Sequence, residues 1–342
     1  MMVQDKAASM WRWASRSIGA HNMGLAVIIT AMVVGMTIQF PEFLTRGNLE
    51  VLVMGFILEA IIALGMTLVI ISAGIDISVA AVLPFTAIVV ALLLHAGLGV
   101  PLAIVLSVLI AAAVGAGNAR MMSLFRVHPF IATLATMLVL RGVNLVVTKG
   151  ATISNLPGQF SVLGQGRVGG IPVPVLLFAA LAVVIGFLLK HHRYFQQVYF
   201  IGGNPKSARL SGIDVDRFLL FAYALCAALA GLAGVIAASQ YGSANSGYGQ
   251  NIEMRVITAV VIGGASLSGG RGSISGSVLG VLFLAIIYNA FAMTGVSTYW
   301  QDVVNGVMLL VAVFLGEYLK DRGKSGRAAP SGLMQAARAK AR

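Results

Sequence analysis

The feature that most constrains this chain is a series of ten apolar segments separated by shorter polar ones. Most of them reach the length of about 20 residues that a helix needs to cross the hydrocarbon core of a bilayer. Charged residues make up 10% of the 342 residues and hydrophobic residues 58%, whereas about 25% of a soluble domain is charged. The chain is therefore predicted to be an all-α polytopic membrane protein. The segments cover residues 23–40, 49–72, 77–95, 101–118, 129–148, 172–190, 217–239, 254–268, 274–294 and 303–319.

The basic residues indicate how these spans are oriented. Ten spans with the amino terminus in the cytoplasm leave few basic residues outside, chiefly Arg46, Lys149 and Arg167, as the positive-inside rule requires. The net charge of +12 therefore fits a membrane topology. No basic stripe with interleaved aromatic residues indicates nucleic-acid binding. A topology of eight spans with two re-entrant hairpins is the alternative.

The spans divide the chain into three parts. Residues 1–22 are predicted to be a cytoplasmic amino-terminal segment, and residues 23–319 the transmembrane domain. Residues 320–342 are rich in Lys and Arg and are predicted to be a disordered cytoplasmic tail attracted to anionic headgroups. The polar segment 151–171 should form the largest outside loop, as a docking surface or a plain connector.

The longest internal segment rich in charge covers residues 190–217. Within it, Asn204 can cap a helix, Pro205 suits the first helical position, and Gly212 suits a left-handed exit. A helix of about 10 Å is too short to cross a bilayer or to be stable alone, so it needs a partner. A solvated surface loop is the alternative.

Four stretches carry a resemblance to a known family. GGNPKSARLSGIDVDRFLLFAYALCAALAGLAG, from Gly202 to Gly234, resembles the coupling-loop region of the permease subunits of ribose-type sugar ABC importers. GMTLVIISAGIDISV, FIATLATMLVLRGVNLVVTKG and AVVIGGASLSGGRGSISGSVLG match the same family. Together these stretches extend the resemblance over residues 48–319, in order and with similar spacing.

The resemblance implies a type II-like ABC importer permease with two related halves in the inner membrane of a bacterium, both termini cytoplasmic. It implies a second permease subunit, identical or paralogous, a pair of cytoplasmic ATPase subunits, and a periplasmic binding protein that delivers a pentose, hexose or polyol-like solute. ATP and magnesium would be bound by the ATPase, so this chain would need no cofactor. The residues that match the coupling region are Gly202, Gly203, Asn204, Pro205, Ala208, Arg209, Leu210 and Gly212.

Two glycine-rich hairpins, SAGIDISVAA (72–81) and ASLSGGRGSISG (265–276), are candidates for the translocation pathway. Breaks between short apolar segments in corresponding parts of a transporter expose backbone groups to polar cargo. The alternative is tight helix packing, since Gly272, Gly276 and Gly280 form a ridge of small residues.

Ionisable groups inside a membrane are functional candidates by default. Glu59, Asp76 and Arg141 fall within the apolar region. They could line the pathway, relay protons or form structural pairs. A charge pair that fixes helix register is the favoured role for Arg141, and Asp76 could instead cap the third span. The full set of predicted pathway residues is Glu59, Asp76, Asn144, Tyr288, Asn289, Tyr299 and Gln301.

No catalytic or metal-binding constellation is visible. His191 and His192 are adjacent, so they point to different faces of a helix. The only cysteine, Cys226, is best read as a small buried hydrophobe. Gly164, Gly166 and Gly169 match G-x-G-x-x-G, but no strand precedes them. The chain is therefore predicted to be a transport subunit and not an enzyme. A proton-coupled secondary transporter that uses Glu59 or Asp76 is the rival, but it leaves the short capped helix unexplained.

Overall fold

The computed structural model describes residues 2–297 and 299–325, and side chains within 19–314 of that part. Nearly all of its regular structure is helical, so the predicted all-α class is confirmed. The elements are α1 (Met2–Gln39), η1 (Pro41–Leu44), α2 (Arg46–Ile71), α3 (Val79–His95), α4 (Val100–Phe125), α5 (Pro129–Thr148), η2 (Gly158–Ser161), α6 (Val162–Gln165), β1 (Arg167–Val168), β2 (Ile171–Pro172), α7 (Val173–His191), α8 (Arg193–Gly203), α9 (Pro205–Leu210), α10 (Val215–Tyr241), α11 (Ile252–Ile262), α12 (Ile274–Thr294) and α13 (Tyr299–Ser325).

Seven of the described helices are long and apolar enough to cross a membrane, namely α1, α2, α4, α5, α7, α10 and α12. The other three predicted segments correspond to α3, α11 and α13. Helix α3 has 17 residues and α11 has 11. At 1.5 Å per residue, α11 spans only about half of a hydrocarbon core of about 30 Å, so it cannot cross alone.

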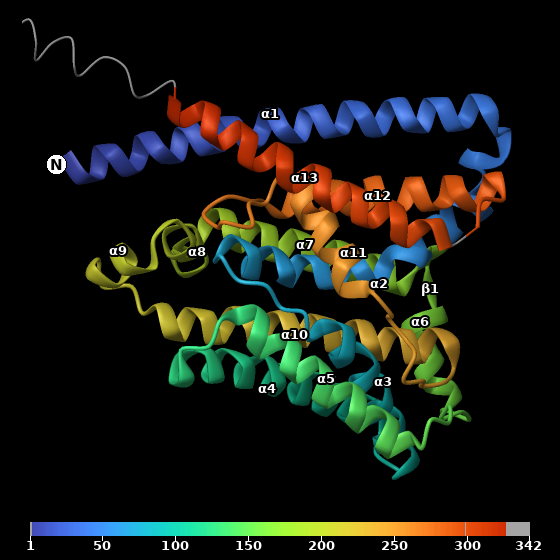
Figure 1. The fold of residues 1–342 in the computed structure, drawn as a ribbon. Helices are drawn as coiled ribbons and strands as arrows, with labels where there is room; N and C mark the ends of the chain where they lie inside the picture. Colours follow the sequence, from blue (N-terminus) through green and yellow to red (C-terminus); the bar gives the residue numbers. More distant parts are fainter. Residues whose placement is uncertain (1, 298, 326–342) are drawn as a thin grey trace, which may run out of the picture.

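The molecule has two distinct ends (Figure 1). Helices α8 and α9 lie at one end, which we call the α9 end, together with the start of α1 and the end of α13. Helix α6 and strand β1 lie at the opposite end, which we call the α6 end. The predicted outside loop therefore contains α6 and a small antiparallel hairpin of β1 and β2. Arg167 of this hairpin forms an ion pair with Glu50 of α2. The hydrogen bond to Glu50 raises the pKa of the Arg167 guanidinium, which is solvent-exposed.

Two irregular segments lead into the short helices. Residues 72–78 leave the end of α2 at the α9 end and run inward to α3, which continues toward the α6 end (Figure 1). The first predicted hairpin is therefore part of a crossing and not a re-entrant turn. Residues 242–251 follow α10 and lead to α11. A Cβ added at Gly249 would lie 3.4 Å from Leu83 of α3, so this segment packs against the first turns of α3.

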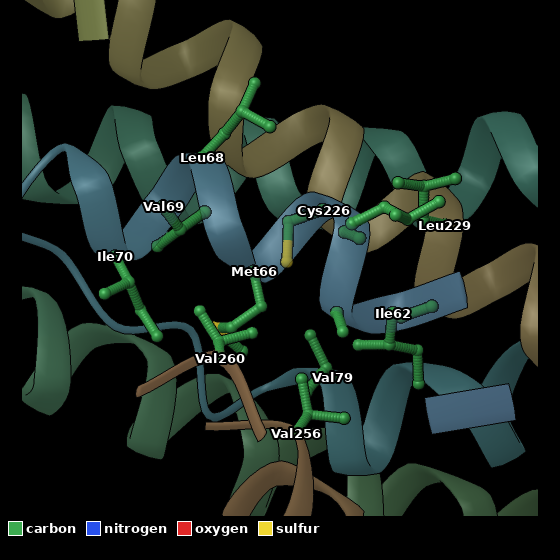
Figure 2. Packing of buried hydrophobic residues seen from close by; sticks show 14 of the residues in the cluster. Ile62, Met66, Leu68, Val69, Ile70, Val79, Cys226, Leu229, Val256 and Val260 are labelled. Carbon is green, nitrogen blue, oxygen red and sulfur yellow. The ribbon is translucent and has the colours of Figure 1, made fainter. Parts of the chain in front are cut away.

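The amino-terminal ends of α3 and α11 converge inside the molecule. Val79 of α3 lies beside Val256 and Val260 of α11 in Figure 2, within one buried cluster. Interrupted helices that meet in this way are typical of transporters, where irregular backbone is tolerated only if protein or a polar cavity covers it. The relation between the two halves of the chain stays a prediction.

Helix α10 occupies the centre of the core and packs against α2, α3 and α4. Figure 2 shows Cys226 and Leu229 of α10 among the buried side chains of α2. Close approach requires glycine here. A Cβ on Gly65 of α2 would lie 2.6 Å from the Cα of Cys226. Small residues bring transmembrane helices together because dispersion contacts then form along the backbones.

Both ends of the chain continue as helices past the predicted domain boundaries. Helix α1 includes most of the predicted segment 1–22 and the first span without a break, and α13 continues to Ser325. The predicted tail is thus helical in its first residues, and 326–342 lie outside the described residues. The predicted coupling loop 190–217 contains two helices, α8 and α9, where one was expected.

Candidate functional site

The short helix predicted from the sequence is α9. The side chain of Asn204 accepts hydrogen bonds from the backbone N–H groups of Lys206 at 3.0 Å and Ser207 at 3.1 Å. Pro205 occupies the first helical position. Gly212 has a φ of +82°, which an L-residue with a Cβ adopts only with strain. These local features set both ends of α9. Its coupling role stays a prediction.

The surface of α9 differs from the predicted one at Ala208. This residue is buried within its own chain, so its small side chain serves packing inside the subunit and does not form the outer face of the helix. Leu210 is 90% exposed. Arg209 forms an ion pair with Asp216 at 2.9 Å. The exposed apolar group at the tip of α9 is therefore Leu210.

Helix α8 touches the end of α2 and the second glycine-rich hairpin through backbone atoms. A Cβ on Gly202 would lie 1.8 Å from the carbonyl oxygen of Ile71 and 2.6 Å from the backbone nitrogen of Gly270. Gly270 N–H donates to that same carbonyl at 2.8 Å. Next to it, Gly203 has open space around its Cβ position. We call this junction of Gly202, Ile71 and Gly270 the Gly202 contact.

The glycines at the end of the second hairpin and in α12 pack closely against α11, and the pathway role of the hairpin stays a prediction. A Cβ on Gly276 would lie 2.0 Å from the carbonyl oxygen of Gly263, and one on Gly280 would lie 1.9 Å from that of Ala259. The predicted ridge of glycines therefore brings the backbone of α12 into direct contact with the backbone of α11. The Gly202 contact further shows that this hairpin lies at the α9 end, beside α8.

Asp76 lies in the irregular segment before α3 and is fully buried. Its Oδ1 accepts hydrogen bonds from the backbone N–H of Ser78 at 3.0 Å and from the Ser78 hydroxyl at 2.5 Å. Asn118 of α4 donates to the same hydroxyl oxygen at 2.9 Å. These contacts support the alternative that Asp76 fixes the turn into α3.

Two ion pairs join the first turn of α11 to neighbouring helices. Glu59 of α2 pairs with Arg255 of α11 at 3.1 Å. Arg141 of α5 lies 3.8 Å from Glu253 of α11. Glu59 and Glu253 are both buried. The predicted role of Arg141 in an ion pair between helices is thus confirmed, and the first turn of α11 is tied to both α2 and α5.

Sequence reasoning missed Glu253 and Arg255. Glu253 directly precedes the predicted apolar segment 254–268 and Arg255 is its second residue, so neither was included among the ionisable groups inside the membrane. The available signal was the combination of two charges with the polar residues of 242–251, directly before an apolar segment too short to cross a membrane.

The predicted pathway residues near the α6 end contact neighbouring helices. Asn289 of α12 exchanges two side-chain hydrogen bonds with Asn48 of α2, at 3.1 and 2.9 Å. Tyr288 stacks on Phe56 with ring centroids 5.4 Å apart, and its hydroxyl is buried without a hydrogen-bond partner among the described residues. Both residues join α12 to α2.

The remaining predicted pathway residues lie apart from that pair. Asn144 of α5 is buried and donates to the carbonyl of Ala81 at 3.3 Å. Tyr299 is 87% exposed at the start of α13, and Gln301 is partly exposed. The structure therefore distributes the predicted set over several places and does not bring it together at one site.

Comparison with known proteins identifies the family. The profile of the branched-chain amino acid transport system / permease component family matches residues 47–313. The ribose import permease protein RbsC of Bacillus subtilis (strain 168) is 40% identical over 307 residues, which cover 89% of this chain and 94% of the relative. RbsC of Escherichia coli (strain K12) is 36% identical over 309 residues, with the same two coverages.

A third relative has another sugar in its name. The L-arabinose ABC transporter permease protein AraH of Azospirillum brasilense is 31% identical over 316 residues, 92% of this chain and 91% of the relative. No solved structure matches the chain significantly. The predicted resemblance to sugar permeases is thus confirmed, and the chain belongs to the family of transport-system permease components, multi-pass membrane proteins of the bacterial inner membrane.

Proposed function

We propose that this chain is the membrane-spanning permease subunit of an ABC importer for a sugar or sugar-like solute. The relatives that cover about nine-tenths of the chain are named for ribose and L-arabinose. The observation that carries the proposal is the Gly202 contact, because it joins the exposed helix α9 and its neighbour α8 to the end of α2 and to the hairpin that precedes α12.

The contact suggests how movement passes from α9 into the spans. A partner that moves α9 also moves α8, since Gly203 and Asn204 connect them directly. Because backbone atoms of Ile71 and Gly270 lie directly against Gly202, no side chain stands between the two surfaces that could adjust to a shift of α8. The end of α2 and the hairpin 265–276 would therefore move with α8.

The arrangement of the two ends leads to the proposed partners. The α9 end, which holds both ends of the described chain (Figure 1), would face the cytoplasm and receive the ATPase, with Leu210 as an apolar contact. ATP and magnesium would bind to that ATPase. The α6 end would face the periplasm and receive the binding protein, and a second permease subunit would complete the transporter.

Proton coupling gains no support from the side chains first considered for it. Glu59 is engaged by Arg255, and one oxygen of Asp76 is engaged by Ser78. The contact with Arg255 gives Glu59 a structural role, whereas the second oxygen of Asp76 is buried without a hydrogen-bond partner among the described residues. Under the proposal the permease itself breaks no covalent bond, and ATP hydrolysis takes place in the partner subunits.

Uptake by whole cells tests this proposal. Cells that produce the chain with an ATPase and a binding protein encoded beside it are given radiolabelled D-ribose, L-arabinose or L-leucine. We expect uptake of a sugar that disappears when the gene for this chain is deleted. Leucine is included because the family description refers to branched-chain amino acids. Uptake of leucine without either sugar would overturn the assignment of the solute class.

A further inference from the structure

A cavity of about 350 Å³ lies where the beginnings of α3 and α11 converge. Its wall combines Ala80 of α3, Arg141 of α5, and residues of the irregular segment before α11. That segment contributes Ser246, Tyr248, Gln250 and Asn251. The cavity is thus built from one helix beginning, one neighbouring helix and the backbone break that leads into α11.

Arg141 shows that this face cannot be turned toward lipid. The residue lies in the second half of α5, and its side chain is 45% exposed. A guanidinium facing hydrocarbon costs at least about 2.5–3.5 kcal/mol, and such groups line water-filled cavities or protein interfaces instead. Val146, five residues further along α5, is 78% exposed and apolar, as a lipid-facing residue should be. Val146 marks the apolar side of α5, whereas the Arg141 side combines the guanidinium with Leu145, an apolar residue that also lines the cavity.

The chemistry of the wall favours an uncharged solute rich in hydroxyl groups. Arg141 is balanced by Glu253 at 3.8 Å, so the site has paired charges and no excess of one sign. Amide and hydroxyl side chains at Gln250, Asn251 and Ser246 can both donate and accept hydrogen bonds. The volume of about 350 Å³ falls at the lower end of the range of about 300–1,000 Å³ for small-molecule sites, which suits a solute of monosaccharide size.

The carboxylate behind Arg141 is a second, independent indication of a polar ligand or water. Glu253 is 5% exposed, and its Oε2 has no hydrogen-bond partner among the described residues. A buried carboxylate oxygen without a partner is costly. Glu253 is not in the wall of the cavity, so the group that satisfies this oxygen would be a water molecule and not the solute itself.

We propose that this cavity is a subsite that the sugar-type solute contacts while it passes through the permease, with Arg141, Gln250 and Ser246 among its hydrogen-bonding groups. The inference rests on the proposed function and specifies where the chain meets its solute. None of the residues in its wall belongs to the pathway set predicted from the sequence.

Cysteine modification in the complete importer tests the subsite. Ser246→Cys is produced with the ATPase and binding protein, and intact cells are treated with a positively charged, membrane-impermeant methanethiosulfonate. We expect modification to reduce uptake of the transported sugar at least tenfold, and excess sugar to slow the modification. The native Cys226 is buried, so the unsubstituted chain is the background control.

Two matched positions make the result specific. Val146→Cys, on the lipid-facing side, should react at least tenfold more slowly, and Val168→Cys, in the exposed β hairpin, should react readily and so shows that the reagent reaches the chain. If Ser246→Cys loses uptake before treatment, Gln250→Cys takes its place. Unchanged uptake after complete modification, or no modification at either cavity position while Val168→Cys reacts, overturns the subsite. ATP-dependent uptake by the unsubstituted chain tests the proposed function separately.

Discussion

The substitution Gly202→Ala tests the Gly202 contact against its neighbour Gly203→Ala. At position 202 the new Cβ would lie 1.8 Å from the Ile71 carbonyl oxygen, so the backbones must separate by roughly 1–2 Å to reach ordinary van der Waals distance. Overpacking of this kind costs about 1–3 kcal/mol, and loss of the hydrogen bond from Gly270 to Ile71 adds about 0.5–1.5 kcal/mol. At position 203 nothing lies within 4 Å of the new Cβ.

Thermal unfolding in detergent and sugar uptake give two measurements of this difference. A loss of about 2–4 kcal/mol at the Gly202 contact lowers the Tm by roughly 4–16 °C on the scale known for domains of 150–250 residues. Uptake should fall at least tenfold, because α8 no longer holds the end of α2. Gly203→Ala should leave both quantities near those of the unsubstituted chain. If the two variants behave alike, the backbone contact does not have the proposed role.

Three further predictions concern the ion pair, the tip of α9 and the topology. Arg255→Ala should destabilise the fold by about 3–5 kcal/mol because the buried carboxylate of Glu59 loses its partner. Adding Glu59→Gln to this variant should restore part of the lost Tm. A double variant with the same Tm as Arg255→Ala would contradict the pairing. Leu210→Glu should leave the Tm unchanged, since Leu210 is 90% exposed, but should reduce the amount of ATPase that copurifies with the chain. Unchanged copurification would show that Leu210 is not part of that interface. Val168→Cys should react with an impermeant maleimide in intact cells, and Ser207→Cys only after lysis. Equal labelling of both in intact cells would contradict the orientation.

Features that depend only on residues close together in the sequence could be predicted from it. The ends of α9 follow from Asn204, Pro205 and Gly212, because capping involves backbone groups within a few residues. The apolar segments likewise follow from local composition. Seven of them have the length of a span in the structure, since each helix satisfies its own backbone hydrogen bonds and needs no distant partner to do so.

Features that depend on distant residues could not be predicted. Gly202 meets Ile71 and Gly270 only after three separate parts of the chain have packed, and no local pattern marks that meeting. The same holds for Glu59 and Arg255, which are 196 positions apart. Ala208 was expected at an outer surface because its small side chain allows close contact, and that property serves equally well inside the subunit.

The irregular segment 242–251 was overlooked for a different reason. Its glycines and polar residues resemble an ordinary connection between spans, and only the depth of Glu253 and Arg255 shows that it leads into the membrane. The hairpin 265–276 is predicted as a pathway element because it resembles the hairpin 72–81, although its share of glycine, four of twelve residues, hardly exceeds the three of ten in 242–251. Its glycines instead allow backbone contacts with Gly202 and with α11. Glycine content alone therefore does not distinguish a pathway from close packing.

Transport by purified components tests the central claim most directly. The chain is reconstituted in proteoliposomes with its ATPase and the binding protein, and accumulation of the sugar identified in whole cells is measured. We predict accumulation that requires ATP and persists when a protonophore removes the pH gradient. Accumulation by the chain alone, driven by an imposed pH gradient and abolished by Glu59→Gln or Asp76→Asn, would contradict the account and establish a proton-coupled transporter.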